Sequence, residues 1–472
     1  MVRFARMSTR GVILGFSLAR AVTVAAAAVV MIVGLVVAGG AGFLASGLLW
    51  APLLASAFVN VQGRPAVEWA EVAGQYAARK ATGQTEFRSK PSKPRPAGTL
   101  ALPGDAASLR FYDDPVTGCC MIHDPHRQTI SAVLAVEHPA YVLLAPDEQA
   151  QRVSAWGRTL ASLAQSGTCA AVQVLEATVP DPGAGIAGWY DKHGIHDGAW
   201  ADAEYRALLD QTTVGSSTHR TTVTVALDMR RAAKAIKDAG RGTKGAAAVL
   251  SADMVALEHG LRTSGLRVSH WLSGTELAAI VRAAYDPAST VLAGQPGARM
   301  DTAGPVAISE RWDRFRSDSG WSAVLWVSDW PRIDVPPHFL HPLVFSPGVR
   351  KTISIVARPL PTNDALKAIR RAKTEAVSDS QQRAKIGQIQ DLSDVQEYDD
   401  LLNRERALIS GHADVAFSGF ISVTAATEDT LSAAVSQIER AASQAACETR
   451  ILYGRQTQGF VVAALPLAIG AW

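Results

Sequence analysis

Residues 21–63 read AVTVAAAAVVMIVGLVVAGGAGFLASGLLWAPLLASAFVNVQG and contain no charged side chain. One continuous helix of this length would reach about 65 Å at ~1.5 Å per residue, roughly twice the ~30 Å hydrocarbon core of a bilayer. The glycine-rich residues 38–42 favour a turn in the middle. We therefore expect a two-helix transmembrane hairpin over residues 20–60. The alternatives are a single kinked span and a cleaved signal peptide, although the run exceeds the ~7–15 apolar residues of a signal peptide.

Basic residues flank this apolar stretch on both sides. Residues 1–19 form a basic N-terminus, and residues 61–98 form a basic, proline-containing linker. Because Lys and Arg beside a span stay on the cytoplasmic side, we expect an inner-membrane protein that crosses twice and whose bulk is cytoplasmic.

The charge is unevenly distributed along the chain. Residues 1–95 carry 11 basic and 3 acidic side chains, a net +8; the whole chain carries +3, so residues 96–472 carry −5. The basic linker suits anionic lipid headgroups. An acidic body and few aromatic residues among the basic ones argue against direct, specific nucleic-acid binding.

The rest of the chain alternates short β-like runs with segments of helical periodicity. We expect a membrane-anchored α+β protein with a first α/β domain over residues 99–290 and a second over residues 291–472. The second domain repeats the alternation of β-like and helical segments seen in the first. Its order of two strands, a long helix, a strand, a helix and a strand predicts a ferredoxin-like layer. We therefore expect two α/β, ferredoxin-like layers with a long helical arm.

A polar helical stretch over residues 362–409 forms a predicted arm with only a thin apolar stripe. Gly387 and Ser393 weaken a continuous helix, so a helical hairpin and a partly disordered arm are both open. A thin stripe fits a small partner surface, and we expect the partner to bury Ile386, Ile389, Leu392 and Val395.

A second candidate partner surface is a cluster of tryptophans. Trp321 and Trp326 are five residues apart, so they should face opposite sides of one strand. The same spacing suggests that they are not both in a core, so that one of them is a candidate to face a partner. The alternative is an ordinary aromatic lining of a two-layer interface.

No sequence pattern predicts catalysis. The chain has no G-x-x-x-x-G-K-[ST] phosphate loop, no G-x-S-x-G elbow and no H-E-x-x-H metal motif. Cys119, Cys120, His123 and His126 lie within eight residues, but adjacent cysteines on a strand point to opposite faces. The alternative is a hairpin turn at Asp124-Pro125 with exposed histidines and with thiols that act as small apolar side chains. We expect no enzyme activity, no catalytic residues, no metal and no cofactor.

Four stretches resemble an actinobacterial integral membrane protein family. They are Arg64-Pro-Ala-Val-Glu68-Trp69-Ala, Pro305-Val-Ala-Ile-Ser-Glu-Arg-Trp312-Asp, residues 350–361 (RKTISIVARPLP) and residues 458–467 (QGFVVAALPL). The resemblance implies a gene beside conjugation-type ATPases. Ala155-Trp156-Gly157-Arg158 also resembles the non-catalytic N-terminal region of the type IV secretion (conjugation) ATPase, whose motor domain is absent from this chain.

The resemblance implies a non-enzymatic scaffold or anchor of a conjugative, type IV secretion-like apparatus for DNA transfer. In that interpretation the protein belongs to an oligomeric complex and docks a cytosolic ATPase and other transfer-apparatus proteins. A first alternative is a membrane component of type VII secretion, which also combines two N-terminal spans with a cytosolic body. A second alternative is a membrane-anchored enzyme.

Overall fold

The computed structural model describes most of the chain. The described residues are 17–61, 64–90, 97–137, 141–180, 184–213, 217–288, 299–331, 333–385, 392–410 and 413–469. Contacts divide the chain into one unit within residues 6–85 and another formed by residues 86–472. Each unit is described by itself.

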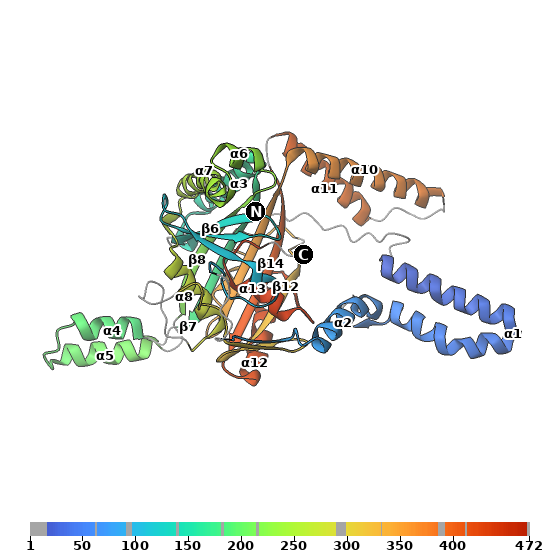
Figure 1. Ribbon diagram of the computed structural model, residues 1–472, viewed down its shortest axis with the longest axis horizontal. Coiled ribbons are helices and arrows are strands. Elements are labelled where there is room, and N and C mark those ends of the chain that lie inside the picture. Colours follow the sequence, from blue (N-terminus) through green and yellow to red (C-terminus); the bar gives the residue numbers. More distant parts are fainter. Residues whose placement is uncertain are drawn as a thin grey trace. The chain divides into compact units, whose positions relative to one another are not determined.

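The first unit contains the long apolar element α1 (Leu18–Phe58), whose N-cap is Ser17. Its backbone leaves the helical conformation at Ala38 and Gly39, where Gly39 has a φ of +57°. Figure 1 shows the chain reversing direction within α1. The most apolar 18-residue window of α1 has a mean hydropathy of 2.7, and only 6% of it is buried. How often α1 crosses a membrane stays a prediction.

Two contacts bring the halves of α1 together. Arg20 Nε donates a hydrogen bond to the carbonyl oxygen of Ala57 at 2.8 Å. A side chain at Gly42 would overlap the carbonyl oxygen of Gly34, so the halves pack at backbone distance. Small residues allow such close approach between helices in membranes.

A short connection leads from α1 to an amphipathic helix. Strand β1 (Asn60–Val61) pairs antiparallel with β2 (Arg64–Pro65), and α2 (Ala66–Ala81) follows. Residue Glu68 in the first turn of α2 accepts a hydrogen bond from Ser17 Oγ at 2.7 Å.

The described part of the second unit is built on a 13-stranded sheet. Its order is β3-β10-β11-β12-β14-β13-β7-β8-β6-β5-β4, with β9 beside β6 and β15 beside β12. Every pairing is antiparallel. The strands are β3 Glu86–Arg88, β4 Arg110–Asp113, β5 Cys120–Asp124, β6 Thr129–Glu137, β7 Cys169–Pro180, β8 Ser217–Asp228, β9 Arg267–Trp271, β10 Ala307–Glu310, β11 Phe315–Ser317, β12 Gly320–Asp329, β13 Arg350–Leu360, β14 Asp414–Ala425 and β15 Glu448–Ile451.

The connectivity of this sheet occurs twice along the chain. Strand β6 pairs with β5, β8 and β9, and β7 pairs with β8; likewise β12 pairs with β11, β14 and β15, and β13 pairs with β14. Both β6 and β12 contain the sequence Ser-Ala-Val-Leu, at residues 131–134 and 322–325. The amide of Leu272 donates to Val133 O at 2.8 Å, and that of Leu452 donates to Val324 O at 2.9 Å.

The two copies of this pattern meet where β7 pairs with β13 in the middle of the sheet. The repeat predicted from the sequence is therefore a repeated strand topology, and both copies belong to one continuous sheet. The structure does not confirm two ferredoxin-like layers, because strands from both predicted domains hydrogen-bond to one another. The domain boundary at residues 290 and 291 stays a prediction.

Helices cover both faces of the sheet (Figure 1). The helices of the second unit are α3 Pro146–Ser166, α4 Ala184–His193, α5 Trp200–Thr213, α6 Ala233–Asp238, α7 Gly242–Thr263, α8 Gly274–Tyr285, α9 His341–Val344, α10 Thr362–Lys385, α11 Leu392–Ile409, α12 Glu428–Gln444 and α13 Gln456–Ala464, with the 3₁₀ turns η1 Gly104–Ser108 and η2 Tyr141–Leu143. Ser273 and Glu276 form a capping box at the start of α8, the cap that a serine followed three residues later by a glutamate favours.

Three cores lie between helices and sheet. On one face the shared core joins Val133 and Val324 to α8 and α13. On the other face, the α7 core contains Leu134, and the α12 core contains Leu325. Successive side chains of a strand alternate between faces, so neighbouring residues of β6 and β12 enter different cores.

Candidate functional surfaces

Trp321 and Trp326 lie on opposite faces of β12, as the spacing predicts. Both are half-buried: Trp321 packs against the α12 core, and Trp326 packs against the shared core. The guanidinium of Arg311 lies 4.7 Å from the Trp321 ring centroid. Each ring contacts a core without being fully buried, because helices cover both faces of this sheet, as expected for an aromatic lining. A partner-binding role for either residue stays a prediction.

The predicted arm is a pair of helices, α10 and α11, inserted between β13 and β14. Val395 on α11 is 44% exposed, and Leu392 begins that helix. Ile386 and Ile389 lie outside the described residues. The structure therefore neither assembles the predicted apolar stripe nor tests it as a partner surface.

Opposite charge helps to hold the arm together. Helix α10 carries six basic and three acidic side chains, whereas α11 carries two basic and five acidic ones. Lys373 Nζ lies 2.7 Å from Glu405 Oε2 across the pair. Ala365, Ile369 and Leu408 form a small buried core beside this contact. The described residues of the arm form two helices, and the choice between a helical hairpin and a partly disordered arm stays a prediction.

A second helix pair, α4 and α5, occupies the equivalent position between β7 and β8. This pair exposes Trp189, Ile195 and Trp200, with 62%, 78% and 78% of their surfaces accessible. The Tyr190 hydroxyl on α4 donates to Asp202 Oδ1 on α5 at 2.9 Å and links the two helices. Our sequence argument did not identify this surface. Exposure depends on tertiary structure, and aromatic residues at these spacings fit a core equally well.

The cysteine and histidine cluster lies on β5 and the turn after it. Cys119 belongs to the α7 core and Cys120 to the shared core, so the two thiols point to opposite faces. Burial raises the pKa of both thiols. Asp124 Oδ1 accepts hydrogen bonds from the amides of His126 (2.9 Å) and Arg127 (3.1 Å), which confirms the predicted hairpin turn. Of the two histidines expected to be exposed, His126 is exposed but His123 is half-buried. Within the described ranges no group of three or more His, Cys, Asp or Glu residues is placed to hold a metal ion.

A buried lysine with a lowered pKa lies where the two halves of the sheet pair. Lys351 on β13 is 1% exposed and donates from Nζ to Ser346 O at 2.8 Å. Burial lowers its pKa to about 8, against a smaller opposing effect of Glu176. Glu176 in turn contacts His219 Nδ1 at 3.0 Å and accepts a hydrogen bond from Thr221. Because Lys351 is closed off from solvent, this cluster is part of the structure rather than an open reaction site.

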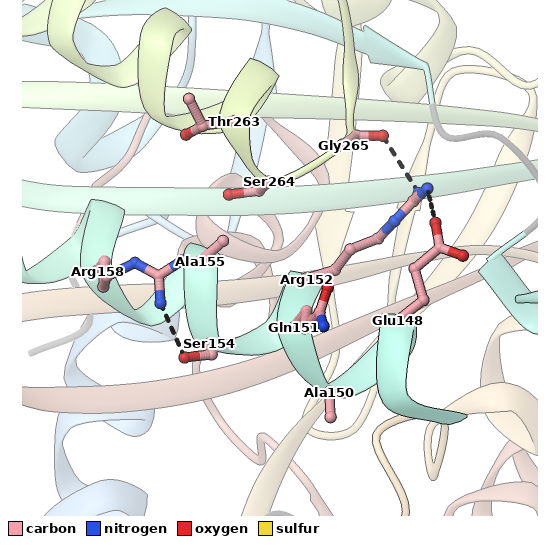
Figure 2. A pocket seen from close by; sticks show the side chains of 10 residues that line it. All are labelled: Glu148, Ala150, Gln151, Arg152, Ser154, Ala155, Arg158, Thr263, Ser264 and Gly265. Carbon is pink, nitrogen blue, oxygen red and sulfur yellow. Dashed lines mark hydrogen bonds and ion pairs between the residues drawn. The ribbon is translucent and has the colours of Figure 1, made fainter. Parts of the chain in front are cut away.

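A hollow of about 530 Å³ lies between α3 and the end of α7 (Figure 2). Arg152 Nη1 donates to Gly265 O at 3.2 Å, and its Nη2 donates to Glu148 Oε1 at 2.8 Å. Arg158 Nη1 donates to Ser154 Oγ at 3.1 Å. Figure 2 shows both guanidiniums directed to partners of the same chain. These three hydrogen bonds join an arginine to a carbonyl, a carboxylate and a hydroxyl, and none of them pairs a nucleophile with a general base.

Comparison with known proteins gives one family match. Residues 216–327 match the model of a family described as "Putative type VII ESX secretion system translocon, EccE". The matched segment extends from the start of β8 to near the end of β12. No curated protein matches the chain.

Proposed function

We propose that this chain is a membrane component of a type VII secretion apparatus. The observation that carries this proposal is the family match over β8 to β12. It favours the type VII alternative over our main interpretation, a conjugative scaffold that docks an ATPase, which the comparisons do not support. The apolar, largely unburied α1 supports the membrane part of the proposal.

We further propose that α1 crosses the membrane twice and leaves the α/β body in the cytoplasm. The break at Ala38 and Gly39 and the contact between Arg20 and Ala57 support this topology. Large apolar side chains on the outside of α1, such as Val36 and Leu48, are 78% and 85% exposed and suit contact with lipid tails. The basic residues on both flanks support the cytoplasmic location of both ends.

In this proposal the body binds other translocon components and has no catalytic role of its own. The absence of catalytic motifs in the sequence supports a binding role. The two helix pairs, α4 with α5 and α10 with α11, are the best candidates for contacts with other components, because each projects from the sheet between two central strands (Figure 1).

Copurification of the tagged full-length chain from its native host in a mild detergent tests the proposal. We expect other type VII membrane components to copurify with it, and deletion of its gene to abolish secretion by that apparatus. Copurification with a conjugation-type ATPase, or unchanged type VII secretion in the deletion strain, would contradict the proposal.

A further inference from the structure

Helix α2 begins at the same level as the ends of α1. The chain leaves α1 after Phe58, and the amide of Ala66, the first residue of α2, donates to Val59 O at 2.9 Å. Ser17, the residue before α1, donates to Glu68 in the first turn of α2 at 2.7 Å. Both ends of α1 and the first turn of α2 are thereby held together.

That level corresponds to the lipid headgroups if α1 is in a membrane. The nearest charged residues on either side of the apolar stretch are Arg20 and Arg64. Charged side chains avoid the hydrocarbon core and take positions at its boundary. The inference therefore rests on the membrane location of α1 in the proposed function.

Helix α2 has two chemically different faces. Trp69, Val72, Ala73 and Tyr76 recur at steps of three and four residues, so they lie on one side of the helix. Residues Glu71, Gly74 and Ala78 lie on the other side. None of the residues of α2 is fully buried, but Trp69, Val72 and Tyr76 are half-buried, and the Trp69 indole donates to Val61 O at 3.0 Å.

The composition of the first face is that of an interfacial helix. Tryptophan and tyrosine are enriched where the bilayer meets water, because an apolar ring and a polar group can each find their preferred surroundings there. Arg79 and Lys80 in the last turn can extend toward phosphate groups. Residues 64–95 carry seven basic and three acidic side chains, which favours an anionic surface over a neutral one.

We propose that α2 lies on the cytoplasmic surface of the bilayer, with the face formed by Trp69, Val72, Ala73 and Tyr76 in the headgroup region and with Arg79 and Lys80 on anionic lipid phosphates. The helix then fixes the depth of α1 and adds an attachment that depends on lipid charge. A lipid surface is the occupant that fits, because this face continues directly from the apolar element and is followed by basic residues.

Two matched substitutions test the proposal in the full-length chain. Ala73→Cys and Ala78→Cys replace exposed alanines on opposite sides of α2. The four native cysteines are buried, so a fluorescent maleimide should label the introduced one. The labelled proteins are reconstituted in vesicles of phosphatidylcholine alone or of phosphatidylcholine with phosphatidylglycerol.

We expect headgroup-region nitroxide lipids to quench the probe at position 73 several-fold more strongly than the probe at position 78. Aqueous iodide should show the opposite preference, and the contrast should grow with phosphatidylglycerol. Replacing Arg79 and Lys80 by alanine should remove this dependence on lipid charge. Equal quenching at both positions would overturn the interfacial helix, and equal contrast in both kinds of vesicle would overturn the anionic preference.

A third label separates this proposal from the proposed function. Val36→Cys lies on α1, where the native side chain is 78% exposed. Quenching of this probe by nitroxides deep in the bilayer, together with equal iodide access at positions 73 and 78, refutes the role of α2 alone. Iodide access at position 36 refutes the membrane location of α1, and with it both proposals.

Discussion

The guanidinium of Arg20 and the carbonyl oxygen of Ala57 form a 2.8 Å hydrogen bond across 37 positions of the chain. The last carbonyl groups of a helix have no partner within the helix, and they carry partial negative charge. Arg20, near the start of α1, therefore provides a hydrogen-bond donor for a carbonyl group near the end of α1. The bond places Arg20, the last cation before the apolar stretch, beside the far end of that stretch, as a chain that returns to its starting side requires.

Because the halves of α1 pack closely, a larger residue in place of Gly42 should destabilise this unit. A leucine there would overlap the Gly34 carbonyl and approach Ala38, so Gly42→Leu should destabilise this unit by about 1–3 kcal/mol. Gly40→Leu is the matched control, because a side chain there meets nothing within 4 Å. Thermal unfolding in detergent micelles measures both variants. An equal effect of the two substitutions would show that the halves do not pack in this way.

Because Lys351 is buried, we expect the free energy of unfolding to depend on pH in a direction that can be worked out. Burial lowers the pKa of Lys351 from 10.5 to about 8 in the folded protein. Between pH 8 and 10.5 the unfolded chain therefore binds more protons, and the free energy of unfolding should rise with pH. In Lys351→Met this contribution disappears. Chemical denaturation of both proteins at several pH values measures the difference, and parallel curves would contradict the assignment.

We expect the side chain of Gln173 to hold the C-terminal segment on the sheet. It is fully buried, and its Nε2 donates to Ser354 Oγ (2.8 Å), Val462 O (3.1 Å) and Leu465 O (3.0 Å). Its Oε1 accepts from the Ala468 amide at 2.6 Å.

Gln173→Leu leaves these buried groups without partners, so it should cost about 1–3 kcal/mol and increase carboxypeptidase digestion. Gln437→Leu is the control, since Gln437 is only half-buried and bonds Ser346 and Pro347. Similar digestion of both variants would show that Gln173 does not anchor the tail.

The sequence also predicts a protein without ATPase activity or bound zinc. Cys119 and Cys120 enter different cores, so one ion cannot easily bind both. The purified protein should contain far less than one zinc per chain and should not hydrolyse ATP. One zinc per chain, lost in Cys120→Ser and His123→Ala, would contradict this prediction, as would turnover that survives removal of contaminating ATPases.

Features that depend on neighbouring residues could be predicted from the sequence. The uncharged run ended by Arg20 and Arg64 locates α1, because solvation by lipid or water depends on composition. Ser273 with Glu276 predicts a helix start, and Asp124-Pro125 predicts a hairpin, because a cap or turn is made by side chains a few residues apart. For the candidate partner surfaces, the sequence indicated which types of residue take part but not which of them are exposed.

Only the tertiary structure decided which strands pair and which side chains remain exposed. Gln173 and Ser354 are 181 positions apart, yet they bond beside the β7–β13 pairing that joins the two halves into one sheet. Alternation along β12 predicts that Trp321 and Trp326 face opposite ways, but whether each face is covered depends on distant helices. Periodicity reports the conformation of a segment. It carries no information about its partner, because the hydrogen bonds of antiparallel strands are backbone bonds that any sequence can make.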